Sequence, residues 1–333
     1  MNDAYEVIVI GGGAAGLSGA LQLARSRRNV LVVDAGRPRN APADGVHGLL
    51  GREGMNPLEL LARGREEVRS YGGEIVEGDV VSATRDGDGD AVDPTGGHRA
   101  QGVAAEPAVG RGIPGFVVEL AGGRRIRAKR LLVAAGLVDE LPDVPGVREG
   151  WGHTVVHCPY CHGWEVRDQA IGVLATGPMS VHQALLFRQL SDDVQFFAHR
   201  QPPPAGEQAE QLAARGITVV TGEVDRLEGS GVRLKSGLLV PRQAIAVATR
   251  MVARSGFLSG LGLKPIEHPS GMGEHIPADP TGRTEVPGVW VAGNVTDLSA
   301  QVGTAAAQGA MAGAQINFDL IGEETAAAVA RRR

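Results

Sequence analysis

The chain has 333 residues, of which 43% are hydrophobic and 4% aromatic, and its formal net charge is −5 at pH 7. This length allows two domains with substantial cores, and the acidic balance argues against nucleic acid as a partner. No stretch approaches the ~20 apolar residues of a membrane span, and the first residues lack the basic and apolar regions of a leader. We therefore expect a cytoplasmic protein with no membrane partner.

The N-terminal segment has the pattern of a dinucleotide-binding unit. A Val- and Ile-rich run over 5–10 is typical of a buried parallel strand, and a helix and a second strand are predicted after it. A GxGxxG turn of Gly11, Gly13 and Gly16 joins the first strand to the helix, and the second strand ends at Asp34. The glycines let the backbone approach a pyrophosphate at the helix N-terminus, and the acid can accept from a ribose hydroxyl. This order predicts dinucleotide binding.

The next segments are less regular. The segment over 36–54, which contains Asn40 and His47, fits a surface loop and equally fits a loop that wraps a flavin. A helix is predicted over 56–71 from the spacing of its apolar residues. Residues 86–115 are rich in Gly, Asp, Ala and Pro, and we predict a long flexible loop without catalytic content there.

A buried strand predicted before residue 134 ends in the small residues Ala134, Ala135 and Gly136, which indicates a second close approach of backbone to a cofactor. Pro142 and Pro145 then predict a hinge between domains.

The only two cysteines, Cys158 and Cys161, are separated by two residues. A pair at this spacing can form a redox-active disulfide, or it can supply half of a metal site. A structural zinc site would need ligands from nearby histidines, because there is no second cysteine pair. The histidines are His153, His157 and His162. We favour the redox role, and we expect no bound metal.

After the cysteines the chain repeats its opening pattern, with a strand over 170–174, a turn over 175–180 and a helix over 181–190. The copy is degraded, since Ala175 and Ser180 stand where the first and third glycines belong, and Ala198 replaces the acid. Arg200 could pair with the 2′-phosphate of NADPH. We predict a second dinucleotide fold whose nucleotide site is doubtful.

The last informative stretch enters a small-residue turn at Gly293 and Asn294 and continues into an Ala/Gly-rich helix predicted over 302–320. The N-terminus of this helix would point at a cofactor, and its partial positive charge can stabilise a reduced flavin anion.

With these motifs in this order, the chain resembles the low-molecular-weight thioredoxin reductase family of flavin disulfide oxidoreductases over nearly its whole length. The resemblance implies an α/β fold of two Rossmann-like dinucleotide-binding domains, the second inserted into the first. The FAD-binding domain would comprise 1–148 and 247–333, and an NAD(P)H-binding-like domain over 149–246 would carry the CxxC. It also implies a homodimer.

The same resemblance implies which residues contact FAD. They are Gly11, Gly13, Ala14, Ala15, Gly16, Asp34, Ala35, Gly36, Asn40, His47, Ala135, Gly136, Gly293, Asn294, Gln301 and Val302.

Two departures from the family pattern bear on function. The reductases carry Asp directly after the second cysteine, where this chain has His162. Of the three arginines of the family's NADPH site, only Arg200 survives, so NADPH use is doubtful. The reductases also have Gly-Asp at the position of Asn294, and Asn can still bond a ribitol hydroxyl.

The form Cys-x-x-Cys-His-Gly-aromatic-Glu is similar to a side branch of the family, the dithiol oxidases that close the disulfide in gliotoxin- and holomycin-type natural products. This implies FAD as cofactor, a small-molecule dithiol as substrate, O2 as electron acceptor and H2O2 as product. Cys158 would react with the substrate, Cys161 would pass electrons to the flavin, and His162 would act as the base.

Three alternatives stay open. An NADPH-dependent reductase would act on thioredoxin or on a small disulfide. A zinc-binding or structural protein would use the cysteines and nearby histidines as ligands. A flavoprotein that has lost turnover would bind a ligand only.

Overall fold

We describe a computed structural model of the chain, which covers residues 2–87, 115–229 and 231–333. The loop predicted over 86–115 lies almost wholly outside the described residues.

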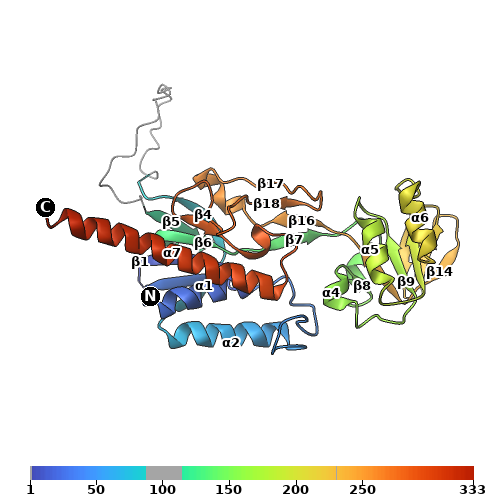
Figure 1. Cartoon of the computed structure of the whole chain (residues 1–333), viewed down its shortest axis with the longest axis horizontal. Coiled ribbons are helices and arrows are strands. Elements are labelled where there is room, and N and C mark those ends of the chain that lie inside the picture. Colours follow the sequence, from blue (N-terminus) through green and yellow to red (C-terminus); the bar gives the residue numbers. More distant parts are fainter. Residues whose placement is uncertain (1, 88–114, 230) are drawn as a thin grey trace, which may run out of the picture.

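A seven-stranded sheet organises the larger half of the molecule (Figure 1). Its strands run in the order β3-β2-β1-β6-β5-β4, and β19 also pairs with β6. They are β1 (Ala4–Ile10), β2 (Val30–Asp34), β3 (Glu74–Glu77), β4 (Val80–Arg85), β5 (Phe116–Leu120), β6 (Arg125–Val133) and β19 (Val289–Val291). The pairs around β1, β2 and β6 are parallel, whereas β4, β5 and β6 form an antiparallel meander. Because the parallel strands are covered on both faces, they are continuous apolar runs rather than alternating ones.

Three helices pack on one face of this sheet (Figure 1). They are α1 (Ala14–Arg25), α2 (Pro57–Ser70) and α7 (Val302–Ala330). The contact between α1 and α7 is a close one, since a Cβ added to Gly309 would stand 1.9 Å from the backbone oxygen of Ala15. The prediction that α7 ends near residue 320 was wrong, because the helix continues to Ala330.

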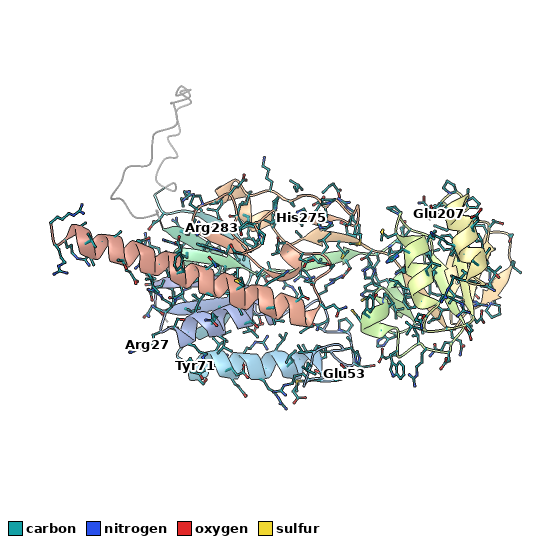
Figure 2. The ribbon with its side chains drawn as sticks, in the orientation of Figure 1. Arg27, Glu53, Tyr71, Glu207, His275 and Arg283 are labelled. Atoms are coloured by element: carbon teal, nitrogen blue, oxygen red, sulfur yellow. The ribbon has the colours of Figure 1, made fainter. Side chains whose placement is uncertain are left out.

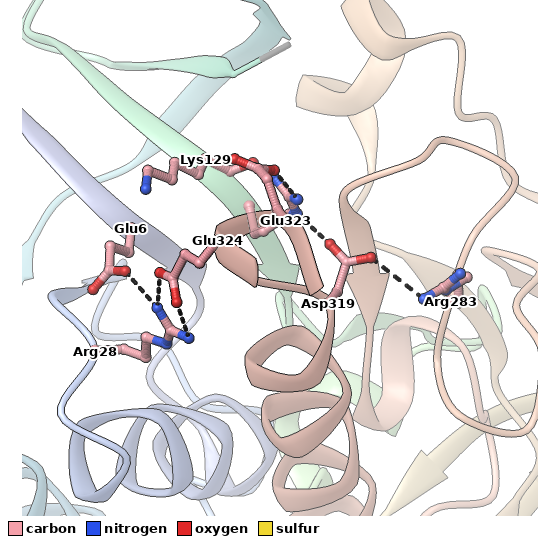
Figure 3. A network of polar contacts seen from close by, with 8 residues as sticks. Glu6, Arg28, Lys129, Arg283, Asp319, Glu323 and Glu324 are labelled. Carbon is pink, nitrogen blue, oxygen red and sulfur yellow. Dashed lines mark hydrogen bonds and ion pairs between the residues drawn. The ribbon is translucent and has the colours of Figure 1, made fainter. Parts of the chain in front are cut away.

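Ion pairs with two nearly buried arginines anchor this extra length of α7 (Figure 3). Arg130 is 1% exposed, and its guanidinium contacts Asp319 at 2.6 Å and Glu323 at 2.5 Å. Nearby, Arg28 pairs with Glu6 at 2.8 Å and also with Glu324. Apolar periodicity alone does not reveal such contacts, which is why the sequence analysis placed the end of the helix too early.

A second sheet forms the smaller half, with five parallel strands in the order β11-β10-β9-β15-β8. The strands are β8 (Val155–Val156), β9 (Ile171–Leu174), β10 (Val194–Phe197), β11 (Thr218–Val220) and β15 (Ala244–Val247). The helices of this half include α5 (Ser180–Phe187), which follows the degraded turn, and α6 (Glu207–Ala214), which the sequence analysis missed. A three-stranded antiparallel sheet adjoins it, made of β12 (Val224–Glu228), β13 (Gly231–Leu234) and β14 (Leu239–Pro241).

Two strands carry the chain between the halves, β7 (Leu137–Glu140) and β16 (Arg250–Ala253), and they pair with each other antiparallel. The prolines of the predicted hinge come just after β7. The remaining short elements are α3 (Val147–Gly150), α4 (Pro159–His162), η2 (Gly256–Leu261), β17 (Ile266–Glu267), β18 (Glu274–His275) and η3 (Gly293–Val295).

The predicted fold class is confirmed, because the chain forms two Rossmann-type sheets and the second lies between β7 and β16, within the sequence of the first. The residue limits of the domains stay predictions. Within the described part of the chain, no helix combines the length and the apolar character that crossing a bilayer requires.

Replacing Arg130 by Met should lower the free energy of unfolding by about 3 kcal/mol, because two carboxylates lose their buried cation. This value is the low end of the range for breaking a buried ion pair, because Asp319 and Glu323 are partly exposed. Urea unfolding measures the change. As a control, Arg63→Met removes an exposed pair with Glu59 and should cost less than about 1 kcal/mol. Equal stability of the two variants would contradict the anchoring role of Arg130.

Candidate active site

A cavity of about 750 Å³ collects residues from both halves of the molecule. The predicted site residues that line it are Gly11, Gly13, Ala14, Ala15, Asp34, Ala35, Asn40, His47, Ala135, Gly136, Cys158, Cys161, His162, Gly293, Asn294, Gln301 and Val302. Two predicted residues, Gly16 and Gly36, do not line it. The fold thus places the residues expected to hold FAD and the cysteine pair around one space.

The glycine turn shapes the first part of this cavity. Gly11 has a φ of +109°, and a Cβ there would stand 2.3 Å from the backbone oxygen of Ala134. A Cβ on Gly16 would stand 1.8 Å from the oxygen of Gly11, so this glycine serves the packing of α1 against the strand. A Cβ on Gly13 would meet no atom within 4 Å, because its backbone faces open space. The turn therefore leaves the start of α1 accessible from the cavity.

Two long helices begin at this cavity with no side chain capping them within the described residues. Gly13 precedes α1 and Gln301 precedes α7, and neither provides a side-chain hydrogen bond to its helix. The first N–H groups of a helix lack partners inside the helix and attract negative charge. A ligand with anionic or electron-rich groups at two separated places, such as a flavin dinucleotide, fits this pair of helix N-termini.

The second glycine-type turn differs, because its donors are already used. The hydroxyl of Ser180 accepts from the backbone N–H of Thr176 at 3.1 Å and from that of Gly177 at 3.2 Å. Arg200, the candidate partner for a 2′-phosphate, donates instead to Glu223 at 2.8 Å. Lys235 pairs with the same carboxylate at 2.9 Å. Ser180 thus occupies two backbone donors of the second turn, and Arg200 is paired with Glu223.

The cysteine pair is partly buried at the wall of the cavity, with the two Sγ atoms 2.7 Å apart. Cys158 directly precedes α4, the short helix that also contains Cys161. The neighbouring Cys161 thiol, followed by the backbone N–H groups of Tyr160 and Cys161, lowers the pKa of Cys158 to about 7 against the opposing effect of burial. The pKa of Cys161 is raised, because its S–H donates to Sγ of Cys158 and because the pair is partly buried. In the reduced pair, Cys158 is therefore the thiol that ionises first, near neutral pH.

Two histidines flank the cysteines in sequence, and both line the cavity. Burial lowers the pKa of His162, and the charge of Glu165 partly opposes this effect. Burial also lowers the pKa of His157, whose Nδ1 lies 3.0 Å from the backbone oxygen of Val247. With Nδ1–H donating to this carbonyl, Nε2 of the neutral ring can accept a proton. Both imidazoles are therefore neutral near pH 7 and able to act as bases.

A partly buried ion pair lies beside the cysteines, and the sequence analysis missed it. Arg39 binds Asp139 through two nitrogens, at 2.6 and 2.7 Å, and the hydroxyl of Thr249 donates to the same carboxylate at 2.7 Å. Arg39 also approaches Oδ1 of Asn294 at 3.4 Å. The Arg39 guanidinium contributes to lowering the pKa of Cys158. No sequence signal could have found a pair whose members are about 100 residues apart in two non-periodic segments.

The described residues contain no group of three or more His, Cys, Asp or Glu side chains placed to hold a metal ion. The cysteines, His157 and His162 line the same cavity, which places a dithiol beside two imidazoles.

Comparison with known proteins identifies the family of the chain. The family model for pyridine nucleotide-disulphide oxidoreductases matches residues 5–312. The chain belongs to this family. It is 29% identical to the thioredoxin reductase tcpT of Claviceps purpurea, over 97% of this chain and 96% of that protein. The predicted resemblance to thioredoxin reductases is confirmed, and the protein is an oxidoreductase with a flavoprotein fold.

Two solved structures of the family resemble the whole chain. The crystal structure of HlmI has a TM-score of 0.86 at 42% identity, and the match covers 99% of this chain and 97% of that one. An oxidoreductase from Agrobacterium tumefaciens has a TM-score of 0.83 at 36% identity, with 96% and 99% covered.

In the reduced protein, the rate of alkylation by iodoacetamide should rise through about pH 7, because Cys158 loses its proton there while Cys161 stays protonated. Peptide mapping should find the first label on Cys158. In Cys161→Ala the rise should move to higher pH, because the largest cause of the lowered pKa is gone. First labelling at Cys161 would contradict this assignment.

Proposed function

We propose that this protein is an FAD-dependent dithiol oxidase that closes a disulfide in a small-molecule dithiol and uses O2 as electron acceptor. The observation that carries the proposal is the contrast between the two glycine-type turns. The first faces the cavity that also contains Cys158 and Cys161, whereas Ser180 occupies the donors of the second. A first turn that faces the cavity and a second turn with two backbone donors occupied by Ser180 favour electron flow from a thiol to oxygen.

FAD fits the residues present. The first turn and the start of α1 would hold its pyrophosphate, and Asp34 would accept from the adenosine ribose. Asp34 is already oriented by Arg65 at 2.7 Å and by the N–H of Gly36 at 3.1 Å. When bound, FAD supplies a two-electron acceptor that O2 can reoxidise, with H2O2 as the product.

The cysteine pair performs the thiol chemistry in two exchanges. One substrate thiolate attacks Sγ of Cys158 in the Cys158–Cys161 disulfide, which forms a substrate–Cys158 bond and releases Cys161 as a thiolate. The second thiolate of the same molecule then attacks the substrate sulfur of the mixed disulfide, which releases the product disulfide and the Cys158 thiolate. A thiol of low pKa is a good leaving group, and the lowered pKa of Cys158 suits this second step. The pair now holds both electrons.

His162 serves as the base for the substrate thiols. Each thiol must lose a proton to become the nucleophile, and a neutral imidazole beside the disulfide can take it. His162 meets this requirement, because burial keeps it neutral near pH 7 and it lies at the cavity with the cysteines. His157, with Nδ1 fixed on Val247, is available for the second proton.

A thioredoxin reductase-like activity is the second candidate. The second dinucleotide fold is intact, and α5 follows its turn as in a nucleotide-binding unit. Binding NADPH there would require the Ser180 hydroxyl to release the turn and Arg200 to leave Glu223. A thioredoxin reductase in Claviceps purpurea is a relative over nearly the whole chain.

The predicted homodimer and the cytoplasmic location stay part of the proposal. A second copy of the chain would cover the exposed apolar residues of α7, namely Met311, Phe318 and Ile321. The partner that we propose for the active site is a small-molecule dithiol.

Anaerobic reduction of the FAD-loaded protein separates the two candidates. Dithiothreitol alone should bleach the visible flavin bands, and admitting air should restore them with formation of peroxide. NADPH should bleach them at less than a hundredth of that rate, roughly the loss expected when a phosphate site is closed. Rapid bleaching by NADPH would support the reductase instead.

His162→Ala should retain its flavin absorbance and slow the aerobic oxidation of dithiothreitol by about 100-fold, the lower range for loss of a general base. The control His268→Ala removes a histidine that does not line the cavity and should leave the rate unchanged. Turnover of His162→Ala at the wild-type rate would rule out this base.

A further inference from the structure

The loop between β2 and α2 reaches across the cavity to the CxxC segment. A bridge between Val46 and Met55 closes its outer part, and Val46 is 3% exposed. Earlier in the same loop, Pro42 lies so near Gly152 that a Cβ on this glycine would stand 3.1 Å from the Cβ of Pro42. The loop therefore rests on the smaller half of the molecule at the edge that carries the cysteines.

His47 forms the polar part of this contact and lies between two carboxylates. Its Nδ1 is 2.6 Å from Oε1 of Glu53, and the backbone N–H of Gly48 holds the other oxygen of that carboxylate at 2.9 Å. Its Nε2 is 3.5 Å from Oε1 of Glu165, four residues after Cys161. Figure 2 shows Glu53 on the side of the larger half that faces the smaller one. The ring of His47 thus contacts one carboxylate from each half of the molecule.

The same residues form the charged surroundings of His162. The charges that act on it are Glu165 and His153 from its own half and His47 and Asp44 from the loop. The negative charge of Glu165 raises the pKa of His162, and a positive charge on His47 lowers it. The two partners of one interdomain pair thus act on His162 in opposite directions.

We propose that His47 and Glu165 form a positioning pair for the cysteine centre: the pair docks the CxxC segment on the loop of the FAD-binding half and sets the charge around His162. This inference rests on the proposed function, in which His162 is the base. The inference assigns a role to Glu165, the glutamate of the Cys-x-x-Cys-His-Gly-aromatic-Glu motif. It also assigns His47 a role in addition to the FAD contact that the family resemblance implies. Glu53 orients His47 for the pairing.

The pH dependence of flavin reduction tests the pair. The limiting rate at saturating dithiothreitol is followed anaerobically by stopped-flow absorbance in the FAD-loaded wild type, His47→Gln and Glu165→Gln. The rate should fall at acid pH as His162 becomes protonated. Without the His47 charge, the pKa of His162 rises and the acid limb moves up by about half a pH unit; without Glu165 it moves down by a similar amount. The thiols of dithiothreitol also titrate, and their contribution to the pH–rate profile is the same in the wild type and in every variant.

Docking is tested by the double variant. Each single substitution should lower the limiting rate at its optimum pH by about tenfold, and the double variant should be no slower than the slower single variant, because both remove the same contact. Glu207→Gln, on the far side of the smaller half in Figure 2, is the matched control and should match the wild type. The flavin absorbance of each variant confirms that FAD is bound.

Shifts of the acid limb in the same direction, or rate losses that multiply in the double variant, would overturn the proposal. A purely structural role for His47 and Glu165 would lower the rate without opposite shifts, and that outcome also overturns it. Failure of the underlying function is distinguishable, because the wild-type flavin would then not be reduced by dithiothreitol at all.

Discussion

The close backbone contact between the glycine turn and the end of β6 is the constraint on which the site depends. Gly11 stands against Ala134, so that no side chain can separate the first strand of the fold from the strand beside it. This contact points the start of α1 into the cavity, and the packing of α7 against α1 points a second helix start at the same space. An electron acceptor held there is fixed by backbone groups, which cannot rotate away as side chains can. The cysteine pair then needs only to be brought to this fixed position.

The chain contains the strand–turn–helix unit twice. The two copies differ in whether a side chain of the turn itself accepts from the N–H groups of the turn. Both turns follow a buried strand and precede a helix. In the first, a Cβ on Gly13 would meet no atom within 4 Å, so the turn is open at this glycine. In the second, the hydroxyl of Ser180 accepts from two backbone N–H groups of the turn. A buried or half-buried N–H needs one acceptor, and an internal acceptor competes directly with a ligand. In the function that we propose, the inserted unit serves as the carrier of the CxxC.

The parts of the fold that depend on local pattern could be predicted from the sequence. The first strand, the glycine turn and Asp34 occur where the motif requires them, and the degraded copy is visible at Ala175 and Ser180. Contacts between distant segments could not be predicted, because no periodicity marks them. The length of α7 depends on Arg130, and the charge beside the cysteines depends on Arg39 meeting Asp139. The helix α6 was missed because it is short and follows three prolines.

The position of His47 illustrates this limit and also connects the two halves of the site. The sequence offers it only as a histidine in a loop without periodicity, and the family resemblance assigns it to FAD. The structure shows one ring nitrogen against Glu53, from the same loop, and the other near Glu165, from the segment of the cysteines. The charge of His47, on the loop of the larger half, acts on His162 in the smaller half. The pKa of His162 therefore depends on the contact between the two halves. In the mechanism that we propose, the base and one of the charges that act on it therefore lie on opposite sides of the boundary between the two halves.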